Sequence, residues 1–152
     1  MKNGIIIFLI LIIIAGAGWY YFNLKSEEPN LIPAPLPANN DPVKAKENLI
    51  RLNSPKPNDV VSSPLLIDGE ARGTWYFEAS FPVSLYDANG KLLARTPAEA
   101  QGEWMTENFV PFKAGLKFDP PTTDTGFLIL EKDNPSGLPE HADELKIPVR
   151  FR

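Results

Sequence analysis

Apolar and polar residues alternate in several short segments between residue 49 and the end of the chain, and this period of two is typical of half-buried β-strands. The last segment, 145–151, alternates most regularly and contains Pro148, which cannot donate a backbone hydrogen bond and therefore predicts an edge strand. Segment 65–71 alternates as well, whereas segment 127–130 is apolar on both faces. Further strands are expected at 49–52, at 81–94 on both sides of a turn, and between 104 and 118.

The turn at 87–90 joins the two strands of a β-hairpin and allows two registers. A two-residue turn at Asn89-Gly90 would place Leu85 opposite Ala94. A type I turn over 87–90, with Gly90 left-handed in a bulge, would place Leu85 opposite Leu93 and Tyr86 opposite Leu92. We expect the second register, because it pairs large apolar side chains with each other. After this hairpin we expect a loop at 97–102.

The composition favours an all-β domain with many turns. The chain of 152 residues contains 16 prolines and 10 glycines, and its short strands follow one another at spacings typical of an antiparallel β-sandwich. It contains no cysteine, which excludes disulfides, thiolate metal ligands and a lipid-modified cysteine. The net charge is −4, and 15 basic residues are scattered among 19 acidic ones, so we expect no nucleic-acid partner.

An apolar run from residue 4 to residue 24 predicts a single transmembrane helix. It contains no charged side chain, and about twenty helical residues span the hydrocarbon core of a bilayer. The aromatic residues at 19–22 are typical of side chains at the level of the lipid headgroups. Ala15 and Ala17 leave the alternative of a signal peptide that is cleaved there. We expect a retained anchor in the cell membrane, with the N-terminus inside and the rest of the chain extracytoplasmic.

A proline-rich linker is predicted at 25–48, where five prolines stand among small and polar residues. Proline at this density favours extended polyproline II, which makes a semi-rigid spacer. Within the linker, Asp41 and Pro42 could cap and begin a short helix over 43–47, and a linker without helix is the alternative. The globular domain is then expected at 49–152.

Several short motifs follow one another through this domain. They are Ser54-Pro-x-Pro57, Val61-x-Ser63-Pro64-Leu65, Gly69-x-Ala71, Phe77-Glu78, Asp87-Ala-Asn-Gly90, Gly102-x-Trp104, Phe112 and Ile147-Pro148-Val149. In this order they resemble the Gmad-type immunoglobulin-like domain of bacterial spore germination proteins, over 49–152. The resemblance implies an immunoglobulin-like antiparallel β-sandwich on the outer face of a bacterial membrane, and it brings no catalytic residues. The chain departs from the family pattern in the aromatic stretch 73–76 and the long loop 133–144.

The sequence offers little support for catalysis or metal binding. His141 is the only histidine, so a Ser-His-Asp arrangement would need it together with Asp143 and either Ser136 or a serine at 62–63. One histidine without cysteine gives too few ligands for a transition metal. The acidic loop 133–144 could offer oxygen ligands to calcium but has no ordered ligand motif, so we expect it to be solvated. We therefore expect no enzyme activity, no metal and no cofactor.

Aromatic residues are the remaining candidates for a binding site. Trp75 and Tyr76 would form a patch for a glycan, a peptide or another domain if they were exposed, and would belong to the core if they were buried. We single out these two as speculative binding residues. The expected function is that of a membrane-tethered, extracytoplasmic immunoglobulin-like module, which acts by protein interaction or as a structural spacer in the bacterial cell envelope. Its partner would be an envelope protein or a glycan. The alternatives are a glycan or peptide receptor, and then a cell-wall hydrolase.

Overall fold

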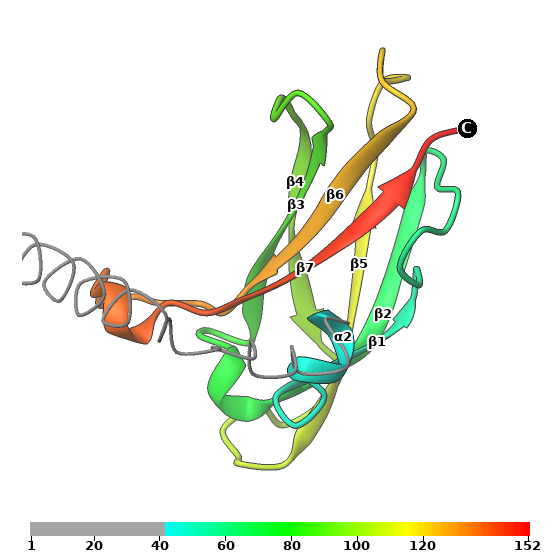
Figure 1. Cartoon of the computed structure of the whole chain (residues 1–152). Helices are drawn as coiled ribbons and strands as arrows, with labels where there is room; N and C mark the ends of the chain where they lie inside the picture. The colour runs from blue at the N-terminus through cyan, green and yellow to red at the C-terminus, as the bar shows by residue number, and fades with distance from the viewer. Residues whose placement is uncertain (1–41) are drawn as a thin grey trace, which may run out of the picture. The chain divides into compact units, whose positions relative to one another are not determined.

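The alternating segments form seven antiparallel strands in the computed structural model, which describes residues 42–152 (Figure 1). The strands are β1 (Ile50–Ser54), β2 (Leu65–Arg72), β3 (Ser80–Asp87), β4 (Leu92–Ala100), β5 (Phe109–Leu116), β6 (Thr125–Glu131) and β7 (Glu144–Arg150). A short helix, α2 (Pro42–Ala45), precedes them, and two 3-10 turns, η1 (Gly73–Trp75) and η2 (Pro139–His141), lie in the connections. The all-β prediction is confirmed.

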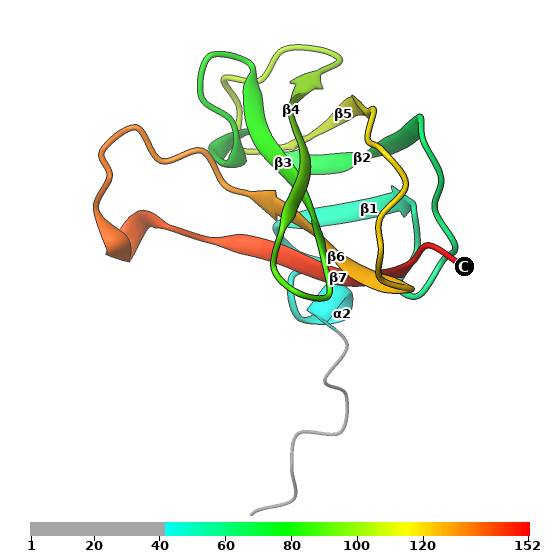
Figure 2. The same ribbon diagram turned by 90° about the horizontal axis from the view of Figure 1, so that it is seen from above.

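The strands belong to one continuous sheet in the order β1-β2-β5-β4-β3-β6-β7, whereas the sequence predicts a sandwich of two sheets. Strand β4 joins the two halves, because it pairs with β3 along most of its length and with β5 only through Glu99–Lys113 and Ala100–Phe112. To reach β5 it runs on through part of the predicted loop 97–102. The sheet curls around a single core in an immunoglobulin-like arrangement, and α2 contacts both β1 and β7 (Figure 2).

The core consists of the inward residues that alternation predicts. On β7, Leu145, Ile147 and Val149 are buried. On β2 the inward positions include Gly69, where a side chain has no room, because a Cβ atom would lie 2.2 Å from the backbone oxygen of Arg51. The absence of a side chain lets β1 and the β5 aromatic residue Phe112 close over this position.

The turn at 87–90 has the predicted type. Gly90 is left-handed, with φ of +80°, and its amide donates a hydrogen bond of 3.0 Å to the carbonyl oxygen of Asp87. Tyr86 pairs with Leu92, as expected.

The register beyond this pair differs from the prediction. A bulge follows Leu92, so Leu85 pairs with Ala94, and the predicted pairing of Leu85 with Leu93 is wrong. Without the extra residue, Arg95 would lie opposite the fully buried Val83 and would face the core. The bulge instead keeps the Arg95 side chain on the outer face of the sheet.

A tight turn precedes β3, where the sequence predicts only a connection. The backbone groups of Phe77 and Ser80 exchange two hydrogen bonds, of 3.0 and 3.1 Å, across the two residues between them. Those residues, Glu78 and Ala79, are both left-handed, with φ of 50° and 63°. Such a turn normally contains asparagine and glycine, which tolerate a positive φ. Glutamate and alanine tolerate it less well, so the backbone is strained here.

Strand β7 lies at the end of the sheet, which confirms the edge position predicted from Pro148. The segment 58–61 covers part of this edge. Asn58 donates its amide to the carbonyl oxygen of Pro148, Val61 donates to Arg150, and Arg150 donates to Asp59. These bonds satisfy backbone groups that an uncovered edge would leave available for pairing.

The predicted anchor at 4–24, and the linker up to residue 41, lie outside the described residues. Within 42–152, none of the helices has the length and apolar character needed to cross a membrane. The short helix predicted at 43–47 is present as α2, and Val43 packs against the core. Lys46, which follows α2, forms an ion pair with Asp143 ahead of β7.

Candidate interaction surface

The two outer faces of the curled sheet differ in chemistry. The face formed by β1, β2 and β5 is charged, and Arg51 and Glu70 form an ion pair of 2.7 Å on it. Its one aromatic ring, Phe109, lies under two guanidinium groups, those of Arg51 at 3.8 Å and Arg72 at 4.1 Å from the ring centre. Leu66 is the most exposed apolar side chain of this face. Such a surface is typical of a solvated sheet face.

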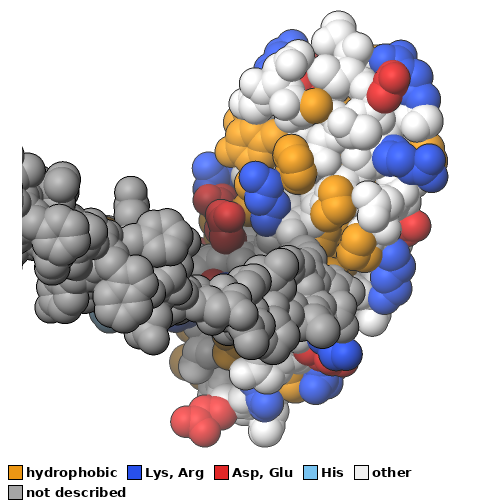
Figure 3. All heavy atoms as spheres, viewed as in Figure 1, with side chains coloured by type: hydrophobic (Ala, Val, Ile, Leu, Met, Phe, Trp, Pro, Cys, Tyr) orange, Lys and Arg blue, Asp and Glu red, His pale blue; other side chains and the backbone are white. Residues whose placement is uncertain are grey.

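The outer face of β4, β3, β6 and β7 is more apolar, and we call it the interaction surface. Cross-strand pairing places Leu92, Tyr86, Phe127 and Pro148 in one row across the four strands. Leu92 is 46% exposed and Phe127 is 36% exposed. Ile129 lies on the same face, two residues further along β6. Figure 3 shows orange side chains among blue ones over this part of the domain.

The sequence carries a readable signal for this surface. Segment 127–130 is apolar at every position, and a strand needs only every second one for the core. Leu128 and Leu130 are fully buried, so Phe127 and Ile129 point outward. This pattern predicts a strand apolar on both faces, and the function of its outward residues becomes visible only in the folded sheet.

A hollow of about 290 Å³ lies at the end of the interaction surface next to the 87–90 turn, and we call it the Lys146 hollow. Tyr86, Phe127 and Ile129 supply most of its apolar wall, together with Ala88 and Gly90 of the turn. The ammonium group of Lys146 lies 4.3 Å from the centre of the Phe127 ring. The hollow therefore combines apolar and aromatic walls with two charged residues, Lys146 and the buried Asp87 of the turn.

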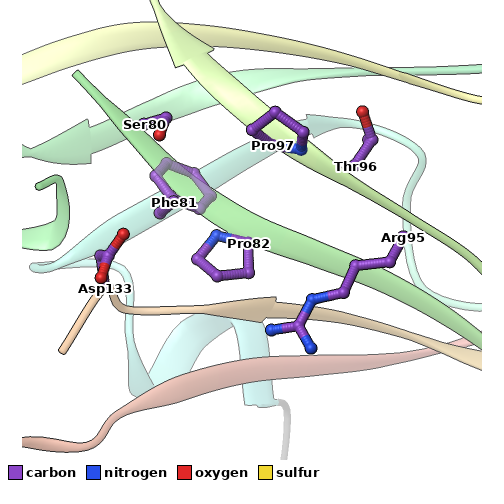
Figure 4. A pocket seen from close by; sticks show the side chains of 7 residues that line it. All are labelled: Ser80, Phe81, Pro82, Arg95, Thr96, Pro97 and Asp133. Atoms are coloured by element: carbon purple, nitrogen blue, oxygen red, sulfur yellow. The ribbon is translucent and has the colours of Figure 1, made fainter. Parts of the chain in front are cut away.

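A second hollow, of about 350 Å³, lies at the opposite end of the same surface (Figure 4). Pro82 and Pro97 are paired across β3 and β4 and form its apolar floor. Asp133 and Arg95 flank Pro82 from two sides. Arg95 is already engaged, because its guanidinium group forms an ion pair of 2.8 Å with Glu131.

The exposed aromatic patch predicted at Trp75 and Tyr76 is not formed, because their side chains are only 2% and 4% exposed. Both rings pack edge-on against Phe81, with centroid distances of 6.4 and 5.1 Å. The Tyr76 hydroxyl donates a hydrogen bond of 2.7 Å to the backbone oxygen of Val110. Burial raises the pKa of this hydroxyl. The local η1 turn, which hydrophobic periodicity does not reveal, directs these side chains inward.

Ser136 and His141 are brought together, but not in the geometry of an activated nucleophile. Ser136 Oγ lies 3.1 Å from His141 Nδ1 and donates its own proton to Asn134 Oδ1 at 2.6 Å. The serine proton is therefore directed at Asn134 and not at the imidazole. Asp143, the acid that such an arrangement would need, is paired with Lys46. Among residues 42–152, no three side chains of the metal-binding types gather in one place.

Comparison with known proteins adds one family match. The model of the immunoglobulin-like domain of bacterial spore germination matches residues 49–137. No curated protein and no solved structure matches the chain. The matched segment contains β1 to β6, and with them Tyr86, Phe127 and Ile129 of the interaction surface, whereas Lys146 and Pro148 on β7 follow it.

Proposed function

The chain belongs to the family of immunoglobulin-like domains of bacterial spore germination, and from this premise we propose that it is a membrane-tethered, extracytoplasmic module that binds a partner protein in the bacterial cell envelope.

One observation carries the binding role: an apolar row crosses the outer face of four strands, where solvent alone would favour polar residues. The row of Leu92, Tyr86, Phe127 and Pro148 crosses four strands, while the opposite outer face is charged. Exposed apolar side chains gathered on one face are typical of surfaces that contact another protein. We therefore assign partner binding to the interaction surface in place of Trp75 and Tyr76.

The tether rests on the sequence of the N-terminal segments. The uncharged run 4–24 is long enough for a membrane-spanning helix, and the proline-rich segment 25–48 would hold the domain away from the bilayer. Cell fractionation of the full chain with a C-terminal tag tests this. We expect it in the membrane fraction, accessible to protease added outside, and a variant without 4–24 in the soluble fraction. A soluble protein whose mass lacks 1–17 would show cleavage and contradict the tether.

Photo-crosslinking in intact envelopes tests the binding role. A photoreactive amino acid at Ile129 reports on the interaction surface, and the same group at Leu66, which is 72% exposed on the opposite face, is the matched control. We expect a discrete protein adduct from position 129 and none from position 66. Equal adducts from both positions, or none from position 129, would contradict a partner on this surface.

A further inference from the structure

We propose that the Lys146 hollow binds an acidic peptide segment of the partner protein. One large apolar side chain of that segment enters the hollow, and a neighbouring carboxylate pairs with the Lys146 ammonium group. This inference rests on the proposed function and specifies the chemistry of the partner.

The walls of the hollow account for the apolar part of the ligand. Tyr86 of β3 and Phe127 of β6 are cross-strand neighbours, and Ile129 continues the wall along β6. An apolar side chain placed here would lose its contact with water against two rings and a branched aliphatic group, which is favourable in proportion to the area covered.

The Asp87 carboxylate and the backbone amides of the turn at the rim already have partners within the domain. Asp87 Oδ1 accepts the amide protons of Asn89 at 2.9 Å and Lys91 at 2.8 Å. The amide of Gly90 donates to the Asp87 carbonyl, and the amide of Ala88 donates to the backbone of β6. The turn therefore helps to shape the hollow but has no free backbone amide to donate to a ligand.

Lys146 is the group that favours a negatively charged ligand in this hollow. The four ion pairs within the described residues use Lys46, Arg51, Arg95 and Arg152 as their cations. Lys146 instead lies over the Phe127 ring, and a cation–π contact at an exposed site stabilises by only about 0.5–1 kcal/mol. Its ammonium group has two further donor positions for a carboxylate, so an acidic ligand complements this hollow.

The second hollow lacks this property. Its cation, Arg95, is neutralised by Glu131, and Asp133 adds a negative charge at the rim. An acidic segment is therefore favoured at the Lys146 end of the interaction surface and disfavoured at the Asp133 end. A longer ligand would accordingly lie with its acidic part at the Lys146 end.

Binding of short peptides to the full chain in phosphatidylcholine nanodiscs tests the inference. Three labelled, acetylated pentapeptides are compared by fluorescence polarisation: a central leucine flanked by glutamates, the same leucine flanked by lysines, and a central serine flanked by glutamates. The protein variants are Lys146→Met, which keeps the apolar stem, and Lys113→Met as a matched control on the opposite face.

We expect the leucine–glutamate peptide to bind most tightly, and Lys146→Met to weaken it about tenfold, the size of one charge-assisted hydrogen bond. Lys113→Met should leave the affinity unchanged. Equal binding of all three peptides, an unchanged affinity in Lys146→Met, or no saturable binding at millimolar peptide would overturn the inference. If anionic vesicles bind in a Lys146-dependent way and the peptides do not bind, the peptide inference is overturned in favour of a lipid surface.

The outcomes separate this inference from the proposed function. If acidic peptides fail to bind while the adduct from position 129 persists, the chemistry assigned to the partner is wrong and the interaction surface remains in place. If the adduct is absent, the proposed function itself fails.

Discussion

The Lys146 ammonium group lies 4.3 Å from the centre of the Phe127 ring, diagonally across the pair of strands β6 and β7. The contact joins the positive charge of the hollow to the apolar row that crosses the interaction surface. A peptide ligand could therefore contact the Phe127 ring with one side chain and the Lys146 ammonium group with the next.

Truncation of Trp75 should damage stability and should not act as a binding mutation. Its side chain is 2% exposed and packs against Phe81, so Trp75→Ala should lower the free energy of unfolding by about 3–5 kcal/mol. Leu66→Ala, at a position 72% exposed, is the control and should change it by less than about 0.5 kcal/mol. Urea unfolding measures both, and a Trp75→Ala protein as stable as the control would contradict the burial.

Tyr76 should make the domain less stable in alkali. Burial raises the pKa of its hydroxyl above the ordinary value of 10.0. As the pH rises past that value, the unfolded chain loses this proton while the folded domain keeps it, so stability falls with increasing pH. Unfolding midpoints at about pH 8 and about pH 11 should differ less in Tyr76→Phe than in the wild type. An equally steep loss in the variant would show that other groups cause it.

The left-handed turn before β3 should be relieved by glycine. Ala79 has φ of 63°, where a residue with a Cβ atom costs about 1 kcal/mol more than glycine. Ala79→Gly should therefore raise the melting temperature, by a stabilisation of up to about 1 kcal/mol. The control is Ala100→Gly in strand β4, where glycine should lower stability by about 0.5–1 kcal/mol. A destabilised Ala79→Gly would show that the turn is not strained.

The predictions that depend on local patterns were the successful ones. Alternation identified the buried residues of β7, proline identified its edge position, and the composition of 87–90 identified the type of turn. Each of these features depends on a few neighbouring residues and on backbone geometry. The pairing of Leu85 with Leu93 failed because the choice depends on keeping Arg95 away from the core, which is a property of the whole sheet.

The site was harder to predict than the fold. Whether Trp75 and Tyr76 are buried depends on the η1 turn and on Phe81 of β3, whose ring packs in turn against Phe112 of β5, far along the chain. The outward apolar face was visible at 127–130, but its partners Tyr86 and Pro148 become neighbours only through strand pairing. Lys146 gains its role only through its position over Phe127.

The most direct test of the interaction surface is the crosslink from Ile129 in a chain that carries Phe127→Glu, with Leu66→Glu as the matched control. Phe127 is 36% exposed, so both variants should fold, and equal melting temperatures would verify this. We predict that Phe127→Glu abolishes the adduct, because a carboxylate disrupts the apolar row, and that Leu66→Glu leaves it intact. An undiminished adduct in a folded Phe127→Glu protein would contradict the account.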